Sequence, residues 1–185
     1  MKLIIGLGNP GKEYESSRHN IGFRIVDLMN KEHGGNFDLD KKSNSEISEI
    51  KVNGNKAILM KPQMFVNKSG EAVKKLAKSL KFKVSNLIVV HDDLDIPFGK
   101  VKLSFGRSSA GHKGVESIIK ALKTEKFYRI RVGTFNSQIV KIRKIKDKRK
   151  RLNEMAKFVL GSFDPSERSK LNKIIKEAIE KSLQL

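Results

Sequence analysis

The chain has 185 residues, of which 38% are hydrophobic and 6% aromatic, a size and composition typical of one soluble domain with its own core. Its 39 Lys and Arg residues outnumber the 20 Asp and Glu residues, and the formal charge of +19 indicates a polyanionic partner such as nucleic acid. The chain has no cysteine, which excludes disulfides, a thiolate nucleophile and a cysteine-ligated zinc site. No apolar run reaches about 18 residues, so we expect a soluble, cytoplasmic protein without a membrane segment.

Five apolar runs predict β-strands, and several are continuous, as in strands that are covered on both faces. In chain order they lie at residues 2–7, 57–62, 86–92, 100–105 and 128–133. Apolar residues spaced three or four apart predict helices between them, at residues 21–28, 73–80 and 115–122. A last helix is expected after Pro165, with its apolar residues facing inward.

The alternation of apolar residues around Asn53 and Gly54 predicts a β-hairpin, and hence an antiparallel part of the sheet. The other strands alternate with helices, a pattern that favours parallel pairing. We therefore predict one α/β domain over residues 1–185. Its sheet is expected to be mixed, mostly parallel and twisted, with helices flanking both faces.

The first predicted strand runs into the stretch "GLGNPG", Gly6–Gly11, which has the G-x-G-x-x-G spacing of a dinucleotide-binding loop. Such a loop needs a helix that begins at the third glycine and an acid at the end of the next strand. The helical stripe begins only at Ile21, and the acid at about the right distance, Asp27, lies inside that stripe. We therefore interpret the glycines as a turn that presents Asn9 at the strand end, where ligands bind in open α/β sheets.

Further polar side chains are expected at the same rim of the sheet. They are His19, Asn67, His91, Asp92, Asp93, Asp95 and His112. A histidine and a carboxylate with amides, but without a nucleophile, suit the activation of water. The imidazole acts as general base, the carboxylate fixes its tautomer and the amides hold a carbonyl.

Two other chemistries fit this rim less well. Asp92 and Asp93 point to opposite sides of a strand and no second acidic cluster completes a coordination sphere, so we expect no metal. The stretch "GRSSAG" only approaches the G-x-S-x-G of serine hydrolases, and the histidine that their chain order requires is missing.

The other histidines have alternative interpretations. His33 precedes two glycines at a predicted helix end, which favours a structural role beside the helix carboxyl terminus. His91 is interpreted equally well as a core residue and as a site residue. His112 is interpreted either as a helix-start residue or as a ligand contact.

An ordered set of motifs resembles bacterial peptidyl-tRNA hydrolases: "GLGNPGKEY", "RHNIG", "KPQMFVNKSG", "HDDLDIPFGKVKL", "SAGHKG", "YRIRVG" and "FVLG". The resemblance covers nearly the whole chain. It implies a monomeric α/β enzyme that hydrolyses the ester between the peptide and the 3′ ribose of peptidyl-tRNA and so recycles tRNA, without a metal or another cofactor. The alternative function is a non-catalytic RNA-binding protein on the same fold.

The resemblance also implies roles for individual residues. It selects His19 as the general base and Asp92 as the acid that orients it. Asn9 and Asn67 would hold the peptide part and position the scissile carbonyl, and Tyr14 would line the same cleft.

Two expected substrate contacts depart from the family pattern. Val66 stands where the family usually has methionine, and it makes a smaller wall for the cleft. Lys113, in "GHKG", stands where asparagine is common. An ammonium group can donate hydrogen bonds but cannot accept them.

The resemblance implies tRNA phosphate contacts by Lys102, Arg129 and Arg131, with Ser104 at the place of a usual second clamp lysine. The chain also has a basic insertion near residues 136–151. Between Lys141 and Arg151 it carries eight basic residues and one acid. Such runs are typical of solvated loops or frayed helices. We expect this one to add salt-sensitive phosphate contacts.

Overall fold

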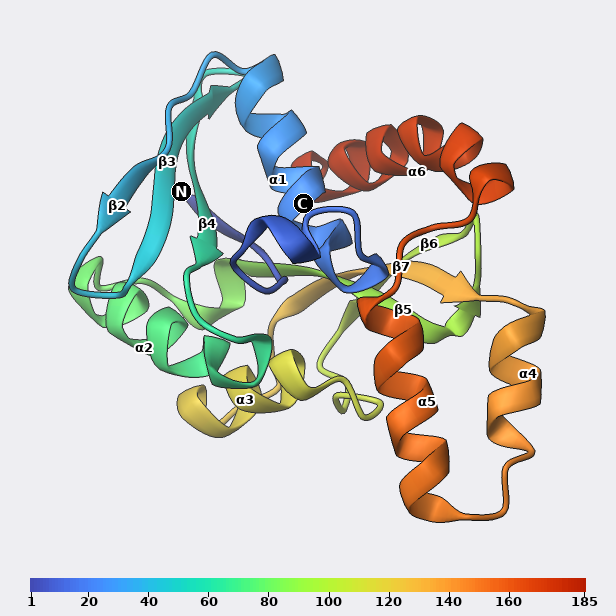
Figure 1. Ribbon diagram of the computed structural model, residues 1–185. Helices are drawn as coiled ribbons and strands as arrows, with labels where there is room; N and C mark the ends of the chain where they lie inside the picture. The colour runs from blue at the N-terminus through green and yellow to red at the C-terminus, as the bar shows by residue number, and fades with distance from the viewer.

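A twisted seven-stranded sheet forms the centre of the protein in the computed structural model, which describes residues 1–185 (Figure 1). Across the sheet the strands are β2 (Asp38–Asp40), β3 (Ser45–Val52), β4 (Asn55–Pro62), β1 (Lys2–Gly6), β5 (Leu87–Pro97), β7 (Tyr128–Phe135) and β6 (Val101–Phe105). The neighbours β4, β1, β5 and β7 pair in parallel, and both edges of the sheet are antiparallel. This arrangement confirms the predicted mixed sheet.

The predicted hairpin is formed by β3 and β4. Its two turn residues, Asn53 and Gly54, have φ values of 48° and 78°. Positive φ at both central residues is the condition for the tight turn whose twist matches that of the flanking strands.

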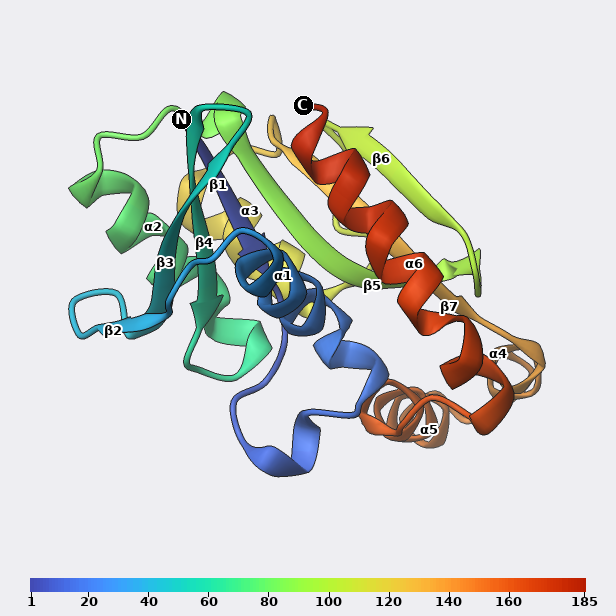
Figure 2. The ribbon, with the colours of Figure 1, turned by 90° about the horizontal axis from the view of Figure 1, so that it is seen from above.

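Four helices cover the two faces of the sheet (Figure 2). α1 (Ile21–Glu32) and α6 (Pro165–Leu183) pack on one face, and α2 (Ser69–Ser79) and α3 (Lys113–Leu122) pack on the other. In β1, Ile4 belongs to the first of these cores, and Leu3 and Ile5 belong to the second. Because successive strand residues point to opposite faces, burial on both faces accounts for the continuous apolar run.

The glycine-rich stretch brings α1 unusually close to β1. A Cβ on Gly6 would lie 2.4 Å from the carbonyl oxygen of Gly22, so only glycine allows this approach. Gly11, with φ of 114°, lies in the predicted turn, and two 3-10 turns (Lys12–Tyr14 and Arg18–Asn20) follow it before α1 begins at Ile21. The dinucleotide-binding interpretation is therefore excluded, and the start of α1 is held over the carboxyl end of β1.

The segment predicted to be a basic insertion, near residues 136–151, folds as part of a helical hairpin that projects from the sheet edge (Figure 1). It consists of α4 (Ser137–Arg143) and α5 (Lys148–Leu160). The side chain of Asn136 accepts a hydrogen bond from the backbone N–H of Gln138, and that of Asp147 accepts one from Lys150. Capped starts of this kind stabilise helices, and the segment forms two helices rather than a loop.

Both ends of the α4–α5 hairpin are fastened to Arg18. The Arg18 side chain is 4% exposed and its Nη2 lies 2.7 Å from Glu167 Oε2. The other oxygen of Glu167 accepts a hydrogen bond from Asn136, at the start of the hairpin. The backbone N–H of Arg18 donates to the carbonyl of Gly161, at the end of the hairpin. The hairpin is thus anchored at the residue that precedes His19.

This anchor predicts a large effect of Glu167→Ala on stability. The change leaves the buried Arg18 guanidinium without its principal partner, which typically costs about 3 kcal/mol or more. Urea unfolding measures the free energy of unfolding. The matched control is Glu180→Ala on the exposed side of the same helix, expected within about 0.5 kcal/mol of native. Equal stabilities of the two variants would contradict the anchoring role.

Candidate active site

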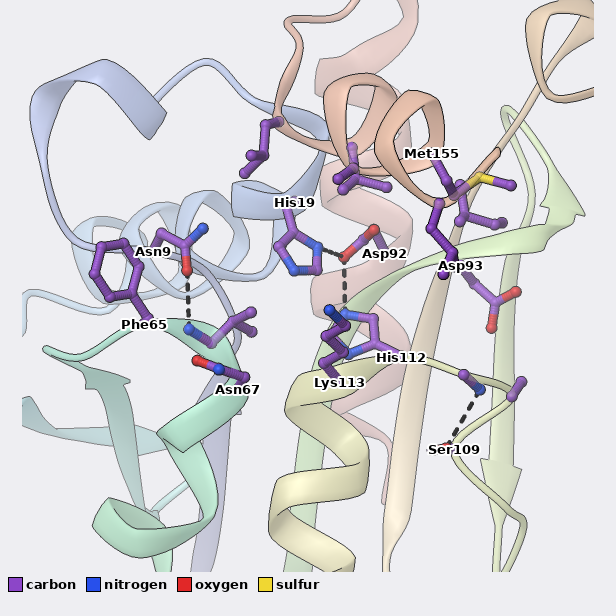
Figure 3. Close-up of a pocket in the computed structure, with 18 of the residues that line it drawn as sticks. Asn9, His19, Phe65, Asn67, Asp92, Asp93, Ser109, His112, Lys113 and Met155 are labelled. Atoms are coloured by element: carbon purple, nitrogen blue, oxygen red, sulfur yellow. Dashed lines mark hydrogen bonds and ion pairs between the residues drawn. The ribbon is translucent and has the colours of Figure 1, made fainter. Parts of the chain in front are cut away.

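A cavity of about 610 Å³ lies at the carboxyl ends of β1 and β5, bounded by the start of α3 and by one face of α5 (Figure 3). In open α/β sheets this is the edge where ligands bind. The cavity brings together most of the predicted site. The polar side chains that line it include Asn9, His19, Asn67, Asp92, Asp93, His112 and Lys113.

His19 and Asp92 form a buried pair. His19 Nδ1 lies 2.8 Å from Asp92 Oδ1, and the two residues are 9% and 2% exposed. With the carboxylate as acceptor, the proton of a neutral His19 sits on Nδ1. The opposite nitrogen, Nε2, makes no hydrogen bond within the protein and keeps its lone pair for a proton from outside. The parallel pairing of β1 and β5 and the 3-10 turn at Arg18–Asn20 place these two side chains together.

His112 binds the same carboxylate oxygen. Its Nε2 lies 3.0 Å from Asp92 Oδ1, while its Nδ1 accepts hydrogen bonds from the backbone N–H groups of Gly114 and Val115. These two acceptor contacts require the Nδ1 lone pair, so the proton is on Nε2 and is donated to Asp92. His112, which caps the start of α3, is therefore also a contact of the Asp92 carboxylate. Its interpretation as a helix-start residue is confirmed, and its contact with a ligand stays a prediction.

Asp92 controls the charge of its surroundings. Burial acts to raise the pKa of its carboxyl group, but the neighbouring His19 and His112 outweigh burial and hold that pKa well below its usual range. Burial acts to lower the pKa of His19, and the charge and hydrogen bond of Asp92 raise it above its ordinary value. The positive charge of Lys113 acts in the opposite direction and lowers the pKa of His19.

Asn9 is held with its amide nitrogen free. Its backbone is bound on both sides by Asn20, whose Oδ1 accepts from the Asn9 N–H and whose Nδ2 donates to the Asn9 carbonyl. The Asn9 Oδ1 accepts from the backbone N–H of Val66 at 2.8 Å. Only the Nδ2 donors remain for the cavity. The sequence patterns did not indicate Asn20, which acts here through Asn9.

One face of α5 forms an apolar wall of the cavity. Its members are Leu152, Met155, Ala156, Val159 and Leu160. Leu152 and Leu160 are 59% and 40% exposed, unusual for leucines on an amphipathic helix. The spacing of three and four residues could have indicated this helical face from sequence.

The other predicted substrate contacts lie around the cavity. Asn67 and the buried Val66 line it, and Val66 also binds Asn9 through its backbone. Lys113 is the first residue of α3 and lines the cavity beside His112 (Figure 3). Tyr14 does not line the cavity, but Phe65 does. The Tyr14 ring packs edge-on against the Phe65 ring, with 6.3 Å between their centroids.

The predicted phosphate contacts lie on β6 and β7, beside the cavity. Arg131 Nε donates to the cavity residue Asp93 at 2.8 Å, and its Nη1 donates to Ser104. Lys102 is exposed and sits opposite Arg131 in the strand pairing. Arg129 is 1% exposed and its Nη1 donates to the carbonyl of Ser108, so it supports the loop before α3.

The remaining histidines lie outside the His19–Asp92 pair. His33 ends α1 and its Nδ1 is bonded to the carbonyl of Met29, which confirms the predicted structural role. His91 is fully buried with its Nδ1 bonded to the Asp92 carbonyl, so it is a core residue.

His19, Asp92 and His112 are also the one group whose ligand atoms are close enough to hold a metal, within 4.8 Å of one another. In the observed hydrogen-bond pattern both nitrogens that face Asp92 carry protons. A metal would have to displace both protons, so these residues are set up for hydrogen bonding rather than for coordination.

An α/β sheet with an imidazole–carboxylate pair and free amide donors in a cleft at its strand ends defines the class of protein: a hydrolase. The comparison with known families gives the particular one. A family model for peptidyl-tRNA hydrolase matches residues 3–185, and the chain belongs to this family.

Relatives and solved structures agree. The chain is 39% identical over 181 residues to the peptidyl-tRNA hydrolase of Aquifex aeolicus, which covers 97% of this chain and 86% of that one. It is 43% identical over 167 residues to the enzyme of Listeria welshimeri, covering 90% and 83%. A crystal structure of the Acinetobacter baumannii enzyme superposes with a TM-score of 0.86 at 28% identity, covering 98% of this chain and 86% of that one. The protein is thus a hydrolase that acts on peptidyl-tRNA.

The buried pair predicts how the His19 pKa responds to Asp92→Asn. In the native protein the acid limb of kcat/KM, which reports the base of the free enzyme, is expected at a pKa above about 6.5. The variant lacks the charge that raises this pKa, so the limb moves to lower pH, and kcat falls by about 10²- to 10⁴-fold.

Rate measurements from about pH 5 to pH 9 test this, with the exposed Asp38→Asn as the control for loss of one carboxylate. A limb that stays in place or moves to higher pH in Asp92→Asn would contradict the assignment.

Proposed function

We propose that the chain cleaves the ester between the peptide and the 3′ ribose of tRNA with a water molecule activated by His19. The observation that carries this proposal is the His19–Asp92 contact, which leaves Nε2 as a proton acceptor facing the cavity. His19 Nε2 takes a proton from water as the water oxygen bonds to the carbonyl carbon. The carbon–oxygen bond to the ribose then breaks, the 3′ oxygen receives the proton, and the peptide leaves as an acid.

The amides around the cavity position the ester for this attack. Asn9 offers only its Nδ2 donors, because its oxygen is already bound by Val66. These donors suit a carbonyl oxygen, which accepts hydrogen bonds and gains negative charge during the attack. Asn67, the residue after Val66, lines the same cavity and offers a second amide, and Tyr14 with Phe65 shapes the outer rim.

The peptide part is proposed to lie against the apolar wall of α5. Peptides on tRNA vary in sequence, so this contact must work without side-chain-specific hydrogen bonds. A row of leucine, methionine and valine side chains meets that condition, since apolar burial is non-directional.

The tRNA part is proposed to contact Lys102 and Arg131 beside the cavity. It is also proposed to contact the basic tip of the α4–α5 hairpin, which we define as Lys141 to Arg151. At this tip only Arg143 forms an ion pair, with Asp95; the remaining cations form none. Three of the cations, Lys148, Arg149 and Lys150, lie in the first turn of α5. The positive end of a helix dipole disfavours cations there, which supports an anionic partner that offsets this cost. Arg129 acts through the loop that it supports.

We also propose that the enzyme acts as a monomer in the cytoplasm. Every side chain of the proposed site comes from one chain, so no second copy is needed to complete it. None of the helices combines the length and the apolar character that a membrane crossing requires.

His19→Ala tests the mechanism against the alternative of a non-catalytic RNA-binding protein. Loss of the general base is expected to lower kcat by about 10²- to 10⁴-fold in the release of labelled peptide from peptidyl-tRNA, with tRNA affinity retained. His33→Ala is the matched control, since His33 lies at the end of α1 and outside the cavity. Equal turnover of wild type and His19→Ala would refute the mechanism. Binding of tRNA without any turnover by wild type would favour the alternative function.

Neutralising the hairpin tip tests its contact with tRNA. Conversion of Lys146, Lys148, Arg149 and Lys150 to glutamine is expected to weaken tRNA binding. It should also reduce the slope of log affinity against log salt by about 0.7 to 0.9 for each tRNA phosphate that the variant no longer neutralises. The control carries the same charge change at Lys31, Lys41, Lys42 and Lys51, exposed residues near the opposite edge of the sheet. A salt slope that is unchanged by the tip substitutions, or reduced equally by the control, contradicts the contact.

A further inference from the structure

Lys113 brings a positive charge to the catalytic cavity. It is the first residue of α3, directly after His112, and its side chain lines the cavity with His19 and Asn67 (Figure 3). Lys113 forms no ion pair with any acid of the chain, whereas Lys120, two turns further along α3, is paired with Glu116 at 2.6 Å. The Lys113 ammonium is therefore available to whatever occupies the cavity.

The position of Lys113 coincides with a second source of positive potential. Lys113 stands at the amino end of α3, where the partial positive charge of the helix dipole is concentrated. The first N–H groups of a helix have no partner within the helix itself. Those of Gly114 and Val115 donate to His112 Nδ1. The cation and the helix end face the same cavity, so anionic charge that develops there is stabilised by both.

The chemistry of the cavity creates such charge at one moment. Before attack the ester carbonyl is neutral. When the water oxygen bonds to the carbonyl carbon, the carbonyl oxygen becomes an oxyanion, and it loses this charge again when the bond to the ribose breaks. A preorganised cation that acts only on this short-lived charge accelerates the chemical step without tightening the binding of the substrate.

We propose that Lys113 is a catalytic residue of this enzyme, which stabilises the oxyanion of the ester through its ammonium group. The inference rests on the proposed role of His19. Lys113 takes no part in the proton transfer: His19 Nε2 receives the proton of the water and delivers it to the 3′ oxygen. Lys113 donates a charge-assisted hydrogen bond to the oxyanion, where Asn9 Nδ2 donates a neutral one.

Lys113 has a second measurable effect, on the base itself. The charged and titratable groups that line the cavity around His19 are Lys68 from the short helix Val66–Lys68, Asp92 and Asp93 from β5, and His112 and Lys113 from the start of α3. The face that α5 presents there is apolar. Lys113 lowers the pKa of His19, against the larger effect of Asp92. Removal of its charge therefore raises the His19 pKa.

Lys113→Met tests the proposal, because it keeps the length of the side chain and removes its charge. The variant is expected to lose about 10²-fold in kcat, with KM and the affinity for uncharged tRNA within about threefold of native. The acid limb of kcat/KM is expected to move to higher pH. Lys113→Arg keeps the charge and is expected to keep the acid limb in place. Lys113→Asn supplies the amide common in the family and is expected to fall between native and Lys113→Met in kcat.

The matched control is Lys120→Met, which removes one exposed lysine from the same helix outside the catalytic cavity, and it should leave kcat and the acid limb unchanged. Thermal unfolding of each variant separates loss of structure from loss of rate.

Two results would overturn the proposal. One is a Lys113→Met variant with native kcat and an unmoved acid limb. The other is a variant with weakened tRNA affinity and a raised KM but native kcat, which would make Lys113 a phosphate-binding residue only. His19→Ala keeps this test separate from the test of the mechanism. An inactive His19→Ala beside a fully active Lys113→Met refutes the role of Lys113 alone, and an active His19→Ala refutes the mechanism on which it rests.

Discussion

The carboxylate of Asp92 is the group on which the site depends. It is 2% exposed, and burial of an ionised group is costly unless hydrogen bonds replace the lost water. Two imidazole N–H groups supply these bonds to one oxygen, one from the turn before α1 and one from the residue that starts α3. The same contacts fix the tautomers of both histidines. These contacts therefore link the ionisation of Asp92 to the placement of α3 and the orientation of His19.

A second linkage runs from His19 to the α4–α5 hairpin. Arg18 lies next to His19 in sequence and is buried beneath the hairpin, where its guanidinium packs 4.3 Å from the ring centroid of Phe158 in α5. Glu167 joins this arginine to the first residue of the hairpin. The surface proposed to meet tRNA and the turn that carries His19 thus share one anchor. A buried ion pair with several additional hydrogen bonds holds its geometry more firmly than a pair on the surface would.

Much of this arrangement could be predicted from the sequence. Periodicity located the strands, the covering helices and the hairpin at Asn53 and Gly54, and the topology of parallel strands placed Asn9 and Asp92 at one rim. The choice of His19 needed the family resemblance, because several histidines fit the rim equally well. The apolar wall of α5 was not predicted, because the prediction for this region rested only on the cations up to Arg151. An apolar helical face can also be assigned to a cavity only when the elements that it packs against are known. The sharing of Asp92 by His112 depends on a contact between residues 20 positions apart, which no local pattern contains.

The two contacts proposed for α5 have a consequence for which molecules the enzyme selects. Its 13 residues span about 20 Å, with unpaired cations at the first turn and apolar side chains from Leu152 to Leu160. A rigid helix keeps these two surfaces at a fixed separation. A ligand that offers both phosphates and a peptide can occupy them together, and each contact raises the local concentration of the other part of the ligand at its own surface. A free tRNA or a small ester can occupy only one of them. With the two proposed contacts in place, the helix would act as a two-point gauge and favour molecules in which both parts are covalently joined.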